Sequence, residues 1–148
     1  MDGGWARDRF ATERVARLAT VDGQGRPLLV PIVFAVAGDV LYSAVDGKPK
    51  STRQLRRLDN IAHNPQVSAL VDRYSEDWDE LWWARADGCA RVIEIDAPEA
   101  TAALIELTGR YPQYREQRPP GPVIAIDVAH WSGWTSRRGR PTHIATAS

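Results

Sequence analysis

The chain has 148 residues, of which 43% are hydrophobic and 26% charged, and its 19 basic residues balance 19 acidic ones. This size and composition fit one globular domain over residues 1–148, and the zero net charge argues against bulk binding to nucleic acid or anionic membranes. No apolar run reaches the roughly 20 residues that cross a bilayer, the charged N-terminus is unlike a signal peptide, and the single cysteine suits a cytoplasmic location.

The N-terminal part of the chain predicts one helix and three strands. A helix is expected over 5–17, and a short strand over 18–21. The run 28–36 is almost entirely apolar and predicts a strand buried on both faces, in which Pro31 marks a bulge or an edge. A tight turn then lets residues 40–45 pair back as the second arm of a hairpin.

The segment 46–57 concentrates positive charge directly after this hairpin. It contains the only two lysines of the chain, Lys48 and Lys50, and carries five positive charges against one negative. A helix that begins here presents unpaired backbone N–H groups and the positive end of its dipole, which together favour a bound phosphate. The alternative is that Ser51 and Gln54 only form a capping box, with the arginines on a solvated helix face.

The helix that follows has an apolar stripe of Leu55, Leu58 and Ile61. It should end just before Pro65, because the residue before a proline disfavours helical dihedrals. The alternating residues 67–71 then predict a strand.

A second capping box, Asp96 with Glu99, predicts another helix with Pro98 in its first turn and Gly109 at its end. The remaining segments of this half are an acidic loop at 76–80, two arms of a strand or a hairpin at 81–85 and 89–95 with Asp87–Gly88 between them, a loop at 111–122 and a strand from 123 to 131.

About six strands and three helices without strand–helix alternation exclude a doubly wound parallel sheet and predict a mainly β fold, an antiparallel barrel with helices outside it. No phosphate-binding glycine motif, Walker loop or nucleophile elbow is present, and the spacing of the histidines predicts no metal site. An enzyme of this kind would rely on a bound cofactor for bond-making. The six tryptophans serve core packing or form a flat wall for a planar ligand.

The order of these segments resembles the split-barrel flavin and deazaflavin oxidoreductases, the pyridoxamine-phosphate-oxidase-like class. The likeness rests on segment 16–27, the strand around Pro31–Ile32–Val33, the Lys48–Pro49–Lys50–Ser51 turn, the helix ending at 60–65 and a late Trp–Ser–Gly–Trp segment. The branch that uses the deazaflavin coenzyme F-420 is the most similar. The resemblance implies a six-stranded antiparallel split β-barrel that forms a homodimer, with two cofactor sites in grooves at the interface.

The resemblance also implies which residues bind the cofactor. Lys50 and Ser51 should contact its phosphate with Thr52 beside them. Lys48 and Arg56 or Arg57 should lie near the phosphate or an acidic tail. The other positions line the ring or the edge of the groove: Val30, Pro31, Ile32 and Val33 from one strand, Tyr42, Ser43 and Ala44 from the next, and Trp78 and Trp134, the latter supplied by the partner subunit.

The function implied is that of an F-420-dependent oxidoreductase, which transfers a hydride between the reduced cofactor and a small organic substrate. The five cations of segment 46–57 suit the polyanionic tail of F-420 better than the single phosphate of FMN. Two alternatives stay open: an FMN-dependent oxidase or reductase of the same fold, and a protein that binds either cofactor without turnover. No catalytic residue is identified; the candidate proton donors are Tyr42, Tyr74, His63 and solvent, of which solvent is preferred.

Overall fold

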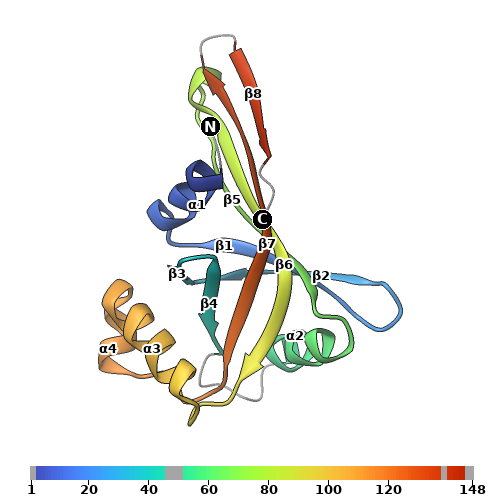
Figure 1. Ribbon diagram of the computed structural model, residues 1–148, viewed down its shortest axis with the longest axis vertical. Helices are drawn as coiled ribbons and strands as arrows, with labels where there is room; N and C mark the ends of the chain where they lie inside the picture. The colour runs from blue at the N-terminus through green and yellow to red at the C-terminus, as the bar shows by residue number, and fades with distance from the viewer. Residues whose placement is uncertain (1–2, 46–51, 138–139, 146–148) are drawn as a thin grey trace.

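The computed structural model describes residues 3–45, 52–137 and 140–145. Within these ranges the chain forms eight strands in one sheet, four α-helices and one short 3₁₀ helix. Figure 1 shows β6 and β7 running along the molecule, with α2 beside their lower part and β8 at the upper end. The elements in chain order are α1 (Gly3–Thr12), β1 (Ala16–Val21), β2 (Pro27–Ile32), β3 (Ala35–Ala37), β4 (Val40–Ala44), α2 (Thr52–His63), β5 (Gln66–Arg73), η1 (Trp78–Glu80), β6 (Trp82–Ile93), α3 (Pro98–Arg110), α4 (Pro112–Glu116), β7 (Val123–Arg137) and β8 (Arg140–Ala145).

The sheet is antiparallel throughout and has the strand order β2-β1-β5-β6-β7-β4-β3, with β8 added by pairing to β7. The described residues show no pairing between the end strands β2 and β3, so the sheet is not closed. The mainly β antiparallel fold with flanking helices is confirmed, but the count of six strands is wrong. The apolar run 28–36 divides into β2 and β3, and residues 140–145, which have no alternating apolar pattern, form β8.

The first apolar strand, β2, lies at an edge of the sheet, as Pro31 indicates. Its pairing among the described residues is with β1. The prediction that β2 is buried on both faces is wrong, because its residues alternate between exposed and half-buried until Ile32. The Leu29 side chain keeps 66% of its accessible surface. An apolar run specifies a strand, but what covers that strand depends on elements far away in the sequence.

Residues 82–93 form one long strand, β6, so the Asp87–Gly88 pair is not a hairpin turn. The register with β7 shifts between Asp87 and Gly88, which is a β-bulge. Gly88 lies so close to β7 that a Cβ atom there would overlap the carbonyl oxygen of Asp127. A residue without a side chain is therefore required by the approach of the neighbouring backbone.

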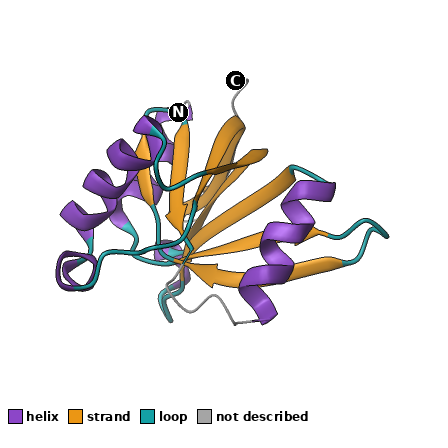
Figure 2. Ribbon diagram, turned by 90° about the horizontal axis from the view of Figure 1, so that it is seen from below, coloured by secondary structure: helices purple, strands orange, loops and turns teal. Residues whose placement is uncertain are grey.

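Two hydrophobic cores lie on opposite faces of β7, because successive residues of a strand point to opposite sides. Ile124 and Ile126 belong to the core that α1 and α2 cover, and Val123 and Ala125 belong to the core beneath α3. Figure 2 shows α2 on the opposite side of the strands from the α3–α4 pair. Each core is thus closed by different helices, and β7 belongs to both.

The first core is closed by aromatic packing from α1 and by a buried hydrogen bond from α2. The Phe10 ring packs edge-on against Phe34 and Trp131, with ring centroids 5.7 and 5.5 Å apart. Asn60 donates from Nδ2 to Oγ1 of Thr20 over 3.1 Å, and both side chains are buried. This bond joins α2 to β1 and provides hydrogen-bond partners for two buried polar side chains.

The helix boundaries confirm some predictions and correct others. The helix α2 ends at His63, just before Asn64–Pro65, as predicted. By contrast, α1 ends at Thr12 rather than 17, and α3 continues through Gly109 to Arg110. The predicted capping box at Glu99 is also wrong: α3 begins at Pro98 after Ala97 with no side-chain cap, and Glu99 binds Arg91 instead. The predicted loop 111–122 contains α4. Among the described residues, no helix combines the length and hydropathy of a membrane span.

Alanine should have opposite effects on stability at Gly88, in the bulge of β6, and at Gly109, in α3. Gly88→Ala should lower the free energy of unfolding by about 2 kcal/mol or more, because the new methyl group meets the β7 backbone. Gly109→Ala should raise it by up to about 1 kcal/mol, because Gly109 is an exposed helical residue with nothing within 4 Å of its position. Urea unfolding followed by tryptophan fluorescence measures both, and equal effects at the two sites would contradict the register described above.

Candidate functional site

The predicted anion site lies between the end of β4 at Ala44 and the start of α2 at Thr52. Lys48, Lys50 and Ser51 lie outside the described residues, as do the side chains of Thr52 and Gln54. β4 precedes this basic segment and α2 follows it, so the segment lies between a strand and a helix as expected. The contacts of these residues with a phosphate, and the capping box, stay predictions.

Arg57, on the second turn of α2, is buried, although the sequence also allowed a solvated helix face. Its side chain retains 7% of its accessible surface, and its Nε atom has no hydrogen-bond partner. Burial lowers the pKa of the guanidinium, with the nearby Tyr114 phenol of α4 acting in the opposite direction. An arginine stays protonated even so, so α2 holds a buried cation with an unsatisfied donor. By contrast, the neighbouring Arg56 is exposed.

The predicted ring-lining strands do meet in the structure. Ser43 of β4 donates its hydroxyl to the carbonyl oxygen of Val33 over 2.9 Å, which joins β4 to the link between β2 and β3. The side chains of Ile32, Ser43 and Ala44 are buried. The remaining predicted positions differ: Val30, Val33 and Tyr42 are half-buried, and Pro31 is exposed.

The two predicted tryptophans of the groove edge lie apart from α2. Trp78 is in η1 and keeps 67% of its accessible surface. Trp134 pairs with Trp83 of β6 and with His143 of β8, and Figure 1 shows β8 at the far end of β7 from α2. Trp134 therefore does not reach α2 within one chain, and its supply by a partner subunit stays a prediction.

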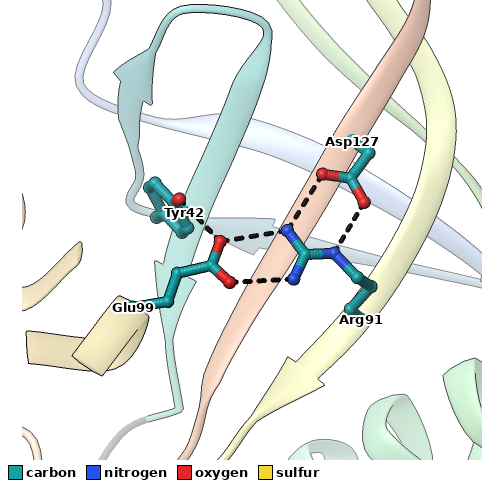
Figure 3. Close-up of polar contacts among 4 residues, drawn as sticks. All are labelled: Tyr42, Arg91, Glu99 and Asp127. Atoms are coloured by element: carbon teal, nitrogen blue, oxygen red, sulfur yellow. Dashed lines mark hydrogen bonds and ion pairs between the residues drawn. The ribbon is translucent and has the colours of Figure 1, made fainter. Parts of the chain in front are cut away.

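A network of four side chains was not predicted, although it contains the predicted ring residue Tyr42 (Figure 3). Arg91 of β6 makes two-pronged contacts with both Glu99 of α3 and Asp127 of β7, at N–O distances of 2.6–3.0 Å. Tyr42 of β4 donates its hydroxyl to Glu99 over 2.8 Å. The network thus ties β4, β6, β7 and α3 together.

The network shifts the protonation of its members. The pKa of Glu99 falls to about 2, chiefly because Arg91 and then Tyr42 hydrogen-bond to the carboxylate. Burial, followed by the bond to Glu99, raises the pKa of Tyr42 to about 12. The Tyr42 hydroxyl is therefore engaged with Glu99 and holds its proton tightly, which makes it a poor proton donor.

The other two side chains considered as proton donors, Tyr74 and His63, are exposed. Tyr74 keeps 66% of its accessible surface. The exposed His63 has its Nδ1 atom 2.9 Å from the backbone oxygen of Asp59, within α2. Solvent stays the preferred source. The described residues contain no group of three or more His, Cys, Asp or Glu side chains suited to a metal ion.

Residues 6–135 match the family model described as pyridoxamine 5′-phosphate oxidase. The chain therefore belongs to this family, whose split-barrel fold the sheet and helices above display. A comparison with curated protein sequences found no match.

Solved structures with the same fold include both flavin-binding and heme-binding proteins. The heme binding protein from Mycobacterium smegmatis has a TM-score of 0.75 at 19% identity, covering 98% of this chain and 57% of that protein. A FAD-binding protein from Mesorhizobium loti has a TM-score of 0.68 at 20% identity, with 90% and 94% covered. HutZ, the heme storage protein from Vibrio cholerae, has a TM-score of 0.66 at 19% identity, with 86% and 90% covered. At these identities the similarity shows a shared fold only.

The network at Arg91 predicts an acid-sensitive contribution to stability. Because the pKa of folded Glu99 is about 2, below its ordinary value of 4.5, the unfolded state binds more protons between these values. The stabilisation is complete above about pH 5 and is lost as the pH falls toward 2. Glu99→Gln removes it, so the difference in unfolding free energy between wild type and variant should shrink over this range. Chemical unfolding at each pH measures this difference, and a difference for Glu99→Gln that stays constant with pH would contradict the network.

Proposed function

We propose that this chain is an F-420-dependent oxidoreductase, which transfers a hydride between the reduced cofactor and a small organic substrate. Membership of a family with a flavin-binding split barrel supports a flavin or deazaflavin as cofactor. The observation that carries the proposal is the buried Arg57 guanidinium with its unsatisfied Nε. A buried cation with a free donor is costly unless an anion completes it.

The charge of the basic segment favours F-420 over FMN. Arg57 follows Lys48, Lys50, Arg53 and Arg56 within ten positions of the chain. A single phosphate needs few of these cations, whereas F-420 also carries a carboxylate tail that several cations can bind. In this proposal Lys50, Ser51 and Thr52 bind the phosphate, Arg57 closes the site from α2, and the remaining cations meet the tail.

The protein residues have positioning roles in this proposal. F-420, when bound, supplies a hydride at C5 of its ring. The link between β2 and β3, held to β4 by the Ser43–Val33 bond, forms a fixed backbone wall on which a planar ring can lie. The network at Tyr42 keeps β4 in place beside it, so the wall needs no rearrangement when a ligand binds. Solvent supplies the proton, since Tyr42 is engaged with Glu99.

A homodimer is part of the same proposal. The exposed edge strand β2, with Leu29 at 66% exposure, leaves an apolar surface that a second subunit can cover. Trp134, which lies far from α2 in its own chain, would then complete the groove of the partner.

Two alternatives are kept. An FMN-dependent enzyme of the same fold would use the same phosphate site, and a non-catalytic cofactor-binding protein would need no proton donor. Recovery of oxidised cofactor from reduced F-420, after addition of an electron acceptor, separates an enzyme from a binding protein. Because heme-binding proteins share the fold, heme belongs among the ligands tested.

Lys50→Ala tests the phosphate assignment. The variant should bind F-420 more weakly by roughly 1.5–3 kcal/mol, the range for a hydrogen bond to a charged group, and should unfold at the same urea concentration as wild type. Isothermal titration calorimetry with F-420 measures the affinity. An unchanged affinity would show that Lys50 does not bind the phosphate of F-420.

Arg57→Met tests the buried guanidinium and separates binding from folding. The affinity for F-420 should fall by a similar amount, roughly 1.5–3 kcal/mol, while the free energy of unfolding stays equal or rises, because an unpaired buried charge is removed. A purely structural role predicts the reverse: lower stability with unchanged affinity. Arg118→Met, at an exposed position beyond α4, is the control and should change neither quantity.

A further inference from the structure

An open pocket of about 540 Å³ lies where the link between α1 and β1 faces the α3–α4 junction. Its volume is within the range of small-molecule sites. Its lining comes from three segments: Arg14 and Val15 before β1, Val33 between β2 and β3, and Tyr111, Pro112, Gln113 and Tyr114 at the α3–α4 junction. Its surface is thus mainly aromatic and apolar, with Gln113 and one cation, Arg14, among its polar groups.

The aromatic wall of the pocket is rigid. The Tyr111 hydroxyl accepts from the Phe34 N–H and lies within hydrogen-bond distance of the backbone oxygens of Phe34 and Arg14, to either of which it can donate, at 2.8–3.1 Å. Arg110 donates to the Phe34 oxygen over 3.1 Å and also to the backbone oxygen of Glu13. These bonds hold the α3–α4 junction against the link after α1, so the pocket exists before any ligand binds.

The rim of the pocket carries an arginine without an ion pair. The described salt bridges do not include Arg14, whose Nη1 atom binds the Arg110 carbonyl and whose guanidinium lies over the Tyr111 ring at 5.7 Å. The neighbouring carboxylate, Glu13, is already paired with Arg73 at 2.7 Å. None of the described residues that line the pocket is acidic. Aromatic and apolar side chains beside a cation that has no ion pair suit a flat anion.

The pocket adjoins the proposed cofactor site at Val33. Val33 lines the pocket and, through its carbonyl, is bound to Ser43 of the proposed ring wall. A ligand in the pocket would therefore lie next to the ring rather than in the phosphate site.

We infer that this pocket binds the substrate of the proposed oxidoreductase, and that the substrate is a planar aromatic or conjugated carboxylate whose ring packs on Tyr114, Pro112 and Val33 while its anion meets Arg14. The substrate role rests on the proposed function; the ligand class rests on the pocket alone.

The test uses 2-naphthoate as the anionic probe and 2-naphthamide as its neutral counterpart. Isothermal titration of the full chain should show saturable naphthoate binding in the range of about 0.1–1 mM, and weaker naphthamide binding. Arg14→Gln should weaken naphthoate binding by about fivefold, the effect of an exposed ion pair, and leave naphthamide within about twofold. Arg118→Gln, an exposed control, should change neither affinity.

A second pair of variants covers the case in which Arg14→Gln disturbs the fold. Val15 is 42% exposed, so Val15→Glu adds a negative charge to the rim without burying it. It should weaken naphthoate binding by about fivefold, whereas Val15→Gln should not. The inference would be overturned if naphthoate showed no saturable binding, or if neither Arg14→Gln nor Val15→Glu changed its affinity.

Repeating the naphthoate titration with F-420 present separates this inference from the proposed function. Undiminished naphthoate binding in saturating F-420 supports two adjacent sites. Competition between them would overturn the substrate assignment and assign the pocket to the cofactor ring. If F-420 binds but naphthoate does not, the pocket inference alone fails; if naphthoate binds with the predicted dependence on Arg14 but F-420 does not bind, the proposed function alone fails.

Discussion

The pairing of β6 with β7 is the constraint on which the rest of the structure depends. It runs from Trp82–Thr135 to Ile93–Val123, and β7 contributes to both hydrophobic cores through alternate residues. The bulge at Gly88 keeps both halves of this long ladder in register with their cores. A one-residue slip would exchange the faces of β7 and place the residues of one core in the other. The helices can therefore pack only where this register puts the apolar faces.

The same pairing sets the geometry of the candidate site. Arg91 and Asp127 lie on β6 and β7 beneath α3, and their network with Glu99 and Tyr42 ties β4 to this frame (Figure 3). β4 in turn holds the link around Val33 through Ser43, and its end leads into the basic segment. The positions proposed for the ring and the phosphate are thus attached to one rigid sheet, while α2 brings Arg57 from the other side.

The features that depend on local sequence were predictable. The antiparallel β class, the edge position marked by Pro31 and the end of α2 before Pro65 all follow from local dihedral and hydrogen-bond preferences. Asp87–Gly88 looked like a turn because this pair favours hairpins, whereas a close approach of β7 decides its role. Glu99 suited a capping box, but its actual partners, Arg91 and Tyr42, meet it only in the folded sheet. The burial of Arg57 likewise depends on residues outside α2, so the sequence pattern of the helix alone does not predict it.

The central claim is that the split barrel holds a deazaflavin through the basic segment and Arg57. The most direct measurement is a titration of the purified chain with F-420, FMN and heme in parallel, followed by quenching of tryptophan fluorescence. The account predicts saturable F-420 binding that is tighter than FMN binding by tenfold or more, about 1.4 kcal/mol, with the preference reduced at high salt because it depends on charge. Equal or tighter binding of FMN or heme, or no binding of F-420, would contradict it.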